Sequence, residues 1–313
     1  MDVVSRAVEA VINGLPNVII KIDEPMKDHT SFKIGGPVRV MLFPGSMPDF
    51  IRVCELLHRF DVVPFIMGNG SNILASDESL DLVVVNTSGV NEFELINGGA
   101  PDHQGNYEIA VDAGALLSKL AVYACENELK GLEFAHGIPG TLGGAVVMNA
   151  GAYGGEMKDV VIRSSVYNVD AGVYELSTDE HNFAYRHSRF SKSDDVILSS
   201  VIRLQKGNKT TIKQKMDELS LRRRKSQPLE VPSGGSTFKR PKESYAAALI
   251  EQAGLKGYTI GRAQVSDKHA GFIVNKGNAS FKDTMAVIEY VQEVIFRQFG
   301  IVLELEVKVL HGK

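Results

Sequence analysis

Apolar residues recur at helical spacing in some parts of the chain and alternate with polar residues in others, which predicts a mixed α and β protein. Ser46 opens a helix with a capping-box pattern, and its predicted apolar face consists of Phe50, Val53, Leu56, Leu57 and Phe60. Ser280 caps a longer helix that Gly300 ends, with an apolar face of Phe281, Met285, Ile288, Val291, Ile295 and Phe299. Further helices are predicted at residues 116–129 and 211–225.

Strands are predicted where short apolar runs or strict alternation occur. The apolar runs lie at residues 62–67, 82–85, 107–111 and 196–204. Residues 160–176 predict a hairpin that turns at residues 170–172. The last segment, residues 301–309, alternates strictly and predicts a strand whose polar side carries Glu304, Glu306 and Lys308.

The length of 313 residues exceeds one typical core and predicts two or three packed units. After residues 206–208 the sequence becomes rich in Lys and Arg, so a domain boundary is predicted near residues 206–210. The net charge of −4 favours neither nucleic acid nor an anionic membrane as the main partner. No signal-peptide pattern is visible at the N-terminus, and no apolar run approaches the ~18 residues needed to span a bilayer.

Cys54 and Cys125 are the only cysteines, and they form no CxxC pattern. We interpret them as buried, reduced thiols of a cytoplasmic protein, with a disulfide or a catalytic thiol as the alternative. The sequence contains no HExxH motif, and lone histidines such as His136, His187 and His269 lack metal-ligand spacing. We therefore expect no metal site.

The segment Gly137–Glu156 is the most informative in the chain. Seven of the residues from 137 to 155 are glycine, none of them is charged, and Ile, Leu, Val and Met lie between the glycines. A solvated linker would carry polar residues instead. The combination predicts a backbone that packs closely against a flat or extended ligand and uses φ angles that other residues avoid.

Neither glycine-rich segment fits a common nucleotide loop. Gly68–Ile73 lacks the third glycine of the dinucleotide fingerprint and precedes a loop and a strand rather than a helix. Gly137–Gly143 is spaced GxxGxxG, and no GK[ST] follows it. Backbone N–H groups in tight turns around Asn69 and Gly140 could still bind a pyrophosphate, so the two loops could hold one long cofactor. Ordinary tight turns between strands are the alternative interpretation.

Seven segments stand in one order from end to end: Thr30–Gly36, Gly68–Leu74, Gly137–Glu156, Tyr185–Phe190, Pro232–Lys239, His269–Asn275 and the terminal Leu-Glu-Leu-Glu-Val. Together they resemble the motifs of the UDP-N-acetylenolpyruvoylglucosamine reductase (MurB) family of peptidoglycan synthesis. The resemblance implies an α+β fold with an FAD-binding domain of the vanillyl-alcohol-oxidase (PCMH) type in two parts, residues 1–80 and 81–206. A C-terminal α/β substrate-binding domain, residues 207–313, would follow.

The resemblance also implies the reaction. NADPH reduces a bound FAD, and the enolpyruvyl double bond of UDP-N-acetylglucosamine enolpyruvate then receives a hydride and a proton to give UDP-N-acetylmuramate. Arg186 would stabilise the charge that hydride transfer leaves beside the carboxylate. Ser236 would donate the proton, and Glu306 would be the catalytic glutamate. Alignment on the final Glu-Val favours Glu306 over Glu304, although spacing alone does not choose between them.

By the same resemblance, the FAD, bound tightly and without a covalent link, would contact Ile34, Gly35, Gly68, Asn69, Gly70, Ser71, Asn72, Gly137, Ile138, Pro139, Gly140, Thr141, Gly143, Gly144, Asn149, Gly151 and Ala152. The substrate would contact Tyr185, Arg224, Lys225, Gln227, His269 and Asn275. Either Arg224 or Lys225 would bind the UDP pyrophosphate. We expect no nucleic acid partner, no membrane insertion and a monomer.

The chain departs from the family pattern at two positions, where His29 and Arg240 stand in place of residues that are often asparagine. Only 50 residues separate Arg186 from Ser236, which leaves little room for the long tyrosine-bearing loop of one branch and indicates the other branch. Two other hypotheses are a flavin oxidase of the same fold acting on another substrate, and a non-catalytic UDP-sugar sensor.

Overall fold

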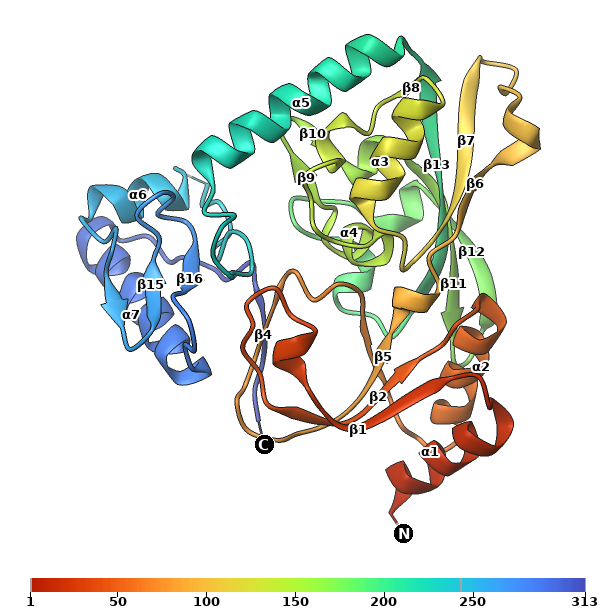
Figure 1. The fold of residues 1–313 in the computed structure, drawn as a ribbon, viewed down its shortest axis with the longest axis horizontal. Coiled ribbons are helices and arrows are strands. Elements are labelled where there is room, and N and C mark those ends of the chain that lie inside the picture. Colours follow the sequence, from red (N-terminus) through yellow and green to blue (C-terminus); the bar gives the residue numbers. More distant parts are fainter. Residues whose placement is uncertain (1, 243, 313) are drawn as a thin grey trace. The chain divides into compact units, whose positions relative to one another are not determined.

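A computed structural model describes residues 2–242 and 244–312, which form two compact units (Figure 1). Unit 1 comprises the residues up to Lys21, Val40–Asn69 and Val83–Leu221. Unit 2 comprises Ile22–Arg39, Gly70–Leu82 and the residues from Arg222 onward. Each unit is therefore assembled from three separate stretches of the sequence.

The chain passes between the units at five points, one in the loop between Asn69 and Gly70 and four inside regular elements. These elements are β1 (Ile19–Pro25), β2 (Pro37–Phe43), β5 (Leu80–Asn86) and α5 (Lys209–Ser226). The three strands belong to one four-stranded sheet in the order β1-β2-β5-β3, in which β3 (Phe65–Met67) runs parallel to β5. A linker with a distinct composition is thus not needed where a strand continues from one unit into the other.

A six-stranded sheet forms the larger part of unit 1, in the order β12-β11-β13-β7-β6 with β8 paired to β13 (Figure 1). Its strands are β6 (Phe93–Leu95), β7 (Asn106–Asp112), β8 (Leu129–Lys130), β11 (Val161–Asn168), β12 (Gly172–Ser177) and β13 (Val196–Lys206). All its pairs are antiparallel. The predicted hairpin is confirmed, because β11 and β12 pair from Arg163–Ser177 to Asn168–Gly172.

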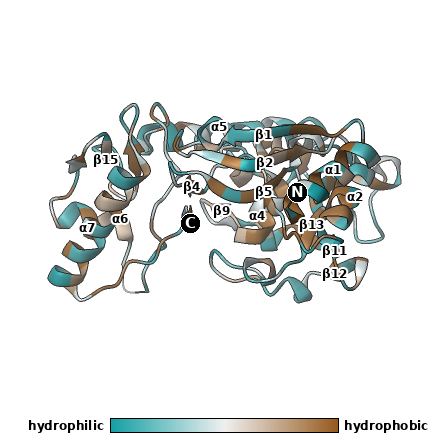
Figure 2. Cartoon of the chain, turned by 90° about the horizontal axis from the view of Figure 1, so that it is seen from below, coloured by the Kyte–Doolittle hydropathy of each residue, from teal (hydrophilic) through white to brown (hydrophobic). Residues whose placement is uncertain are grey.

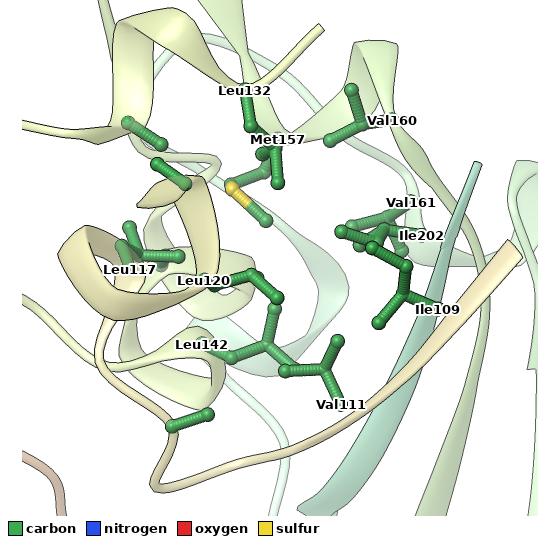
Figure 3. Close-up of a cluster of buried hydrophobic side chains, with 14 of the residues drawn as sticks. Ile109, Val111, Leu117, Leu120, Leu132, Leu142, Met157, Val160, Val161 and Ile202 are labelled. Carbon is green, nitrogen blue, oxygen red and sulfur yellow. The ribbon is translucent and has the colours of Figure 1, made fainter. Parts of the chain in front are cut away.

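One core of unit 1 lies between this sheet and two helices, α3 (Leu117–Glu126) and α4 (Leu142–Met148). Figure 3 shows Ile109, Val111 and Ile202 of the strands facing Leu117, Leu120 and Leu142 of the helices. All six side chains are buried. Their removal from water supplies the main driving force for packing here.

A second core of unit 1 surrounds α1 (Val3–Gly14) and α2 (Met47–His58). The predicted face of α2 is confirmed for Phe50, Val53, Leu56 and Leu57, which are buried, while Phe60 packs against them partly exposed. The side chain of Ser46 accepts a hydrogen bond from the Asp49 N–H, as the capping pattern predicts. Unit 1 also contains the short strands β9 (Gly151–Ala152) and β10 (Gly155–Glu156).

Unit 2 has its own core between α6 (Ala246–Gln252), α7 (Phe281–Phe299) and a three-stranded sheet. The sheet consists of β14 (Thr259–Ile260), β15 (Ala263–Val265) and β16 (Ile273–Asn275), and a separate parallel pair joins β4 (Ile73–Ala75) to β17 (Lys308–Leu310). The caps of α7 are confirmed: Ser280 and Asp283 form a capping box, and Gly300 ends the helix at φ 67°. Both hydrophilic and hydrophobic residues occur along α7 (Figure 2).

The prediction of a regular strand over residues 301–309 is wrong for most of its length. Residues 301–307 form only one isolated bridge, between Leu305 and Phe238, and the ladder begins at Lys308. The alternation is nevertheless real, because Leu303 and Val307 are buried whereas Val302 and Glu304 are exposed. The segment alternates because it packs on the core of unit 2, and it pairs with a loop instead of a full strand.

Within the part of the chain that the structure describes, we find no helix with both the length and the apolar character that crossing a membrane requires.

We predict that Gly114→Ala destabilises the protein by about 1–3 kcal/mol, as overpacking of a close-packed site does. An added Cβ would lie 1.8 Å from the Thr87 carbonyl oxygen and 2.5 Å from that of Val90, and neither backbone atom can rotate away. Chemical denaturation would measure the change. Gly45→Ala is the control, since its Cβ would meet nothing within 4 Å. Equal stability of the two variants would show that the backbone around Gly114 has room for a side chain.

Candidate active site

Two of the motif segments are bonded together inside unit 2 through Thr237. We call them the serine loop (Pro232–Lys239) and the terminal glutamate segment (residues 303–307). The Thr237 N–H donates to the Gly271 carbonyl over 2.9 Å, and its carbonyl accepts from the Glu306 N–H, also over 2.9 Å. Its hydroxyl oxygen accepts from the Ile273 N–H over 3.1 Å. Thr237 is 1% exposed, so these bonds are shielded from water. Ser236, the preceding residue, is therefore held close to Glu306.

Two further motifs of unit 2 join this arrangement. The Ser31 hydroxyl donates to the Ser233 carbonyl over 2.6 Å, and the Asn72 amide donates to the Glu306 carbonyl over 3.1 Å. Gly234 packs so closely on the buried Phe32 ring that an added Cβ would lie 2.5 Å from a ring carbon. Segments that are more than 200 residues apart in sequence thus meet at the serine loop.

The two candidate glutamates lie in different surroundings. Glu304 has a side chain that is 73% exposed and forms an ion pair with Lys239 over 3.2 Å. Glu306 is partly buried, and its backbone is bonded on both sides, to Thr237 and to Asn72. The surroundings of Glu306 are those of a site residue, whereas those of Glu304 are typical of a solvated surface pair.

His269 and Asn275 both lie beside the serine loop but differ in what their side chains can do. The His269 Nδ1 accepts from the Gly271 N–H over 3.2 Å, and burial lowers the pKa of this imidazole, so its neutral form carries the proton on Nε2. The Asn275 side chain is buried and binds three backbone groups, of Phe32, Gly277 and Ala279. These bonds indicate a structural role for Asn275.

Arg186 lies in unit 1, in a tight turn closed by the Ala184–His187 bridge. Its φ is 50°, a left-handed value that is uncommon for a residue with a side chain. Its guanidinium donates to the Gly151 carbonyl over 3.2 Å and lies 5.1 Å from the centre of the exposed Tyr185 ring. Strained residues of this kind cluster at functional sites.

Gly68 and Asn69, the residues with which the first predicted flavin loop begins, contact the second predicted loop within unit 1. The Asn69 amide donates to the Pro139 carbonyl over 2.7 Å. A Cβ on Gly68 would lie 2.1 Å from the Thr141 hydroxyl oxygen and 3.1 Å from the Thr141 Cβ, so a larger residue at position 68 would press against the second loop. In the described chain, no protein acceptor takes the backbone N–H of Asn69, Gly70 or Ser71. These N–H groups fit the oxygens of a pyrophosphate, so the loops fit an FAD.

The glycines of residues 137–155 act mainly through close approach. The prediction of unusual φ angles is wrong for most of them, because only Gly154 has a positive φ while Asn149 and Tyr153 adopt one without being glycine. A Cβ on Gly151 would lie 2.6 Å from the Gly155 carbonyl, and one on Gly155 would lie 2.5 Å from the Phe134 ring. Part of the segment forms helix α4, which contains Gly143 and Gly144.

The remaining predicted residues lie on the surface or serve the fold. Arg224 and Lys225 are exposed at the end of α5, and the Gln227 side chain accepts from the Arg223 Nε over 2.8 Å. The buried Asn149 amide donates to the Glu156 carboxylate and to the Ala184 carbonyl, which connects the glycine segment to its own C-terminal end and to the residue where the arginine turn begins. Arg240 lies 4.1 Å above the centre of the Tyr245 ring.

Sequence reasoning missed Thr237, which connects the serine and glutamate motifs. Nothing in the sequence around a single threonine indicates that both its backbone groups and its hydroxyl are buried and bonded. Both cysteines are free and buried, as predicted, and burial raises the pKa of Cys54 to about 12, so that this thiol is not a nucleophile. The described residues contain no group of three or more His, Cys, Asp or Glu side chains placed to hold a metal ion.

Comparison with known proteins gives the family. Residues 38–177 match the FAD binding domain family, and residues 227–310 match the C-terminal domain of UDP-N-acetylenolpyruvoylglucosamine reductase. The UDP-N-acetylenolpyruvoylglucosamine reductase of Caldanaerobacter subterraneus subsp. tengcongensis is 48% identical over 97% of this chain and 99% of its own, and that of Agathobacter rectalis is 45% identical over 97% and 98%.

The crystal structure of UDP-N-acetylenolpyruvylglucosamine reductase (MurB) from Thermus caldophilus has a TM-score of 0.76 and 31% identity, covering 94% of this chain and 99% of that one. The α+β fold is thus an FAD-binding domain of the PCMH type followed by a MurB C-terminal domain. The chain belongs to the UDP-N-acetylenolpyruvoylglucosamine reductase family, the FAD- and NADPH-dependent UDP-N-acetylmuramate dehydrogenases of peptidoglycan precursor synthesis.

Proposed function

We propose that Ser236 and Glu306 supply the proton chemistry of this reductase and that Arg186 supplies the cation. The observation that carries the proposal is the bond from the Glu306 N–H to the Thr237 carbonyl, one residue beyond Ser236. A serine hydroxyl is a weak acid and donates only when it is held beside developing negative charge. The bonds of Thr237 supply a fixed position for the neighbouring Ser236, and they hold the backbone of Glu306, the proposed catalytic glutamate, beside the same segment.

We propose that FAD lies along the two glycine loops. The N–H groups of Asn69, Gly70 and Ser71 would bind its pyrophosphate, and the close contact of Gly68 with Thr141 would keep the loops at the spacing that the cofactor needs. When bound, FAD passes the hydride of NADPH to the enolpyruvyl double bond. The other predicted cofactor contacts, at Ile34, Gly35 and from Gly137 to Ala152, remain part of this proposal.

Arg186 is proposed to stabilise the negative charge that appears beside the substrate carboxylate. A cation that is held in a fixed position stabilises the charge of a transition state without reorganising. The tight turn and the bond to Gly151 restrict where that cation can be.

For the substrate, we propose contacts from Tyr185, from Arg224 or Lys225, from Gln227 and from His269. The exposed Tyr185 ring and the two exposed cations are accessible to a ligand. The neutral His269 offers an Nε2–H donor. The motif predicts Asn275 as a further substrate contact, but its three bonds to backbone groups favour a role in holding the loop.

We propose a division of labour in which residues 1–80 and 81–206 bind FAD and residues 207–313 bind the UDP-sugar. The matched ranges 38–177 and 227–310 fall inside these limits and support it. We also propose that the protein acts as a cytoplasmic monomer of the branch without the tyrosine loop. The short interval between Arg186 and Ser236 supports the assignment to that branch.

Gly68→Ala is expected to weaken FAD binding about tenfold or more, because the clash with Thr141 would push the two loops apart. The flavin absorbance per purified protein, followed by an FAD titration, would measure the loss. Gly45→Ala, at an open and exposed position, is the control. Unchanged FAD affinity in Gly68→Ala would exclude this pair of loops as the cofactor site.

Ser236→Ala should leave reduction of the flavin by NADPH nearly unchanged and slow its reoxidation by the enolpyruvyl sugar by about 10²-fold or more. Only the second half-reaction needs the proton. Anaerobic stopped-flow absorbance separates the two steps, and Ser226→Ala at the end of α5 is a matched serine control. An equal loss in both half-reactions would refute the proton-donor role.

A third comparison separates the two glutamates. Glu306→Gln is expected to slow the second half-reaction by about 10²-fold or more, since the amide cannot exchange a proton. Glu304→Gln keeps the same change in charge at an exposed ion pair and should stay within about twofold of the parent. If the same stopped-flow assay found the larger effect at Glu304, the assignment would have to be reversed.

A further inference from the structure

A buried chain of hydrogen bonds in unit 1 ends at His181, a residue that has no role in the reaction proposed above. The Ser200 and Ser164 hydroxyls lie 2.6 Å apart, and Ser164 Oγ lies 2.8 Å from His181 Nε2. His181 Nδ1 lies 2.6 Å from the Ser177 carbonyl oxygen. Ser164, Ser200 and His181 are at most 1% exposed. Ser164 and Ser200 face each other directly across β11 and β13, so the sheet fixes one end of the chain.

The acceptors define the direction of this chain. The Ser177 carbonyl can only accept, so His181 Nδ1 carries the proton and Nε2 accepts from the Ser164 hydroxyl. Ser164 then accepts from Ser200. Burial lowers the pKa of His181, which keeps this imidazole neutral and the direction intact. Every polar atom of the ring is therefore bonded in one orientation.

The same ring touches both ends of the segment that carries Arg186. The His181 ring stacks on Phe183, with centres 4.9 Å apart and planes at 16°, and meets Phe190 edge to face at 5.7 Å. Phe183 precedes the turn Ala184–His187 and Phe190 follows it. We call these three side chains the aromatic clamp. Aromatic pairs at these distances attract each other beyond the area they bury.

The turn depends on such support because its backbone is strained. Arg186 adopts a left-handed φ of 50°, and Asn182, before the turn, adopts one of 49°. A strained conformation persists only where its surroundings hold it. Two hydrogen bonds connect the turn to the glycine segment. The Asn149 amide donates to the Ala184 carbonyl, and the Ser188 hydroxyl donates to the Val147 carbonyl. The aromatic clamp connects the turn to the six-stranded sheet, because His181 is bonded to Ser164 of β11.

We propose that His181 is a positioning residue for Arg186: the buried Ser200–Ser164–His181 chain orients the imidazole, and the imidazole holds the two phenylalanines that flank the arginine turn. This inference rests on the proposed role of Arg186 in the second half-reaction. His181 is fully buried, so we expect it to act through these contacts and not on the substrate directly. Its removal is expected to displace the guanidinium, and a misplacement of about 1 Å at a reacting centre can slow a reaction about 10²-fold.

The test is a double-mutant cycle read in each half-reaction. His181→Ala is expected to slow flavin reoxidation by the enolpyruvyl sugar by about 10–100-fold and to change flavin reduction by NADPH by less than about twofold. In an Arg186→Ala background the same substitution should change reoxidation by less than about threefold, because the residue it positions is gone. Ser164→Ala, which keeps the ring and removes its hydrogen-bond donor, should show a smaller slowing with the same pattern.

His58→Ala is the matched control. His58 is also in unit 1, bonds to the Tyr167 hydroxyl over 3.4 Å and stacks on that ring at 5.7 Å, but its partner does not flank Arg186. It should leave reoxidation within about twofold of the parent. A crystal structure of His181→Ala gives a readout other than activity, and it should show the turn displaced and the bond from Arg186 to Gly151 broken.

The outcomes separate the inference from the proposed function. Equal slowing by His181→Ala with and without Arg186, or an undisplaced turn in the crystal, would overturn the positioning role. If Arg186→Ala alone left reoxidation unchanged, the proposed role of Arg186 would fail instead, and the inference would fall with it even if the turn moved.

Discussion

The three hydrogen bonds of Thr237 are the constraint on which the position of the proposed proton donor, Ser236, depends. They connect the serine loop to residues 271–273 on one side and to Glu306 on the other. Because Thr237 is buried, breaking any of them would leave a polar group without water or partner. The position of Ser236 is thus set by the fold of unit 2 and not by the serine itself.

In unit 1, the proposed site residues are held by close backbone approach and by side-chain contacts to a strained turn. Its glycine loops approach each other until a single methyl group would separate them, as at Gly68 and Thr141. Its arginine turn is held in a strained conformation by amide, hydroxyl and aromatic contacts. In each unit, buried and hydrogen-bonded groups hold residues for which we propose a catalytic role, as preorganised catalysis requires.

Local signals in the sequence predicted what local forces determine. Ser46 caps α2, Ser280 and Gly300 bound α7, and the hairpin of β11 and β12 turns where expected, because caps and turns depend on neighbours in sequence. The motifs also identified the family. Three other features depend on contacts between segments that are distant in sequence: the pairing of residues 304–306 with the serine loop, the hydrogen bonds of Thr237, and the aromatic clamp. No local pattern in the sequence indicates these contacts. The unit boundaries are equally hard to predict where the chain passes between units inside β1, β2 and β5, because no linker of distinct composition marks them.

The role of Ser236 as proton donor is best tested by the solvent isotope dependence of the two half-reactions, followed anaerobically by flavin absorbance. We predict that NADPH bleaches the flavin at the same rate in H₂O and D₂O, and that recovery on adding UDP-N-acetylglucosamine enolpyruvate is slower in D₂O, because an exchangeable serine proton is transferred in that step. Recovery at the same rate in both solvents, or recovery only in air, would contradict it.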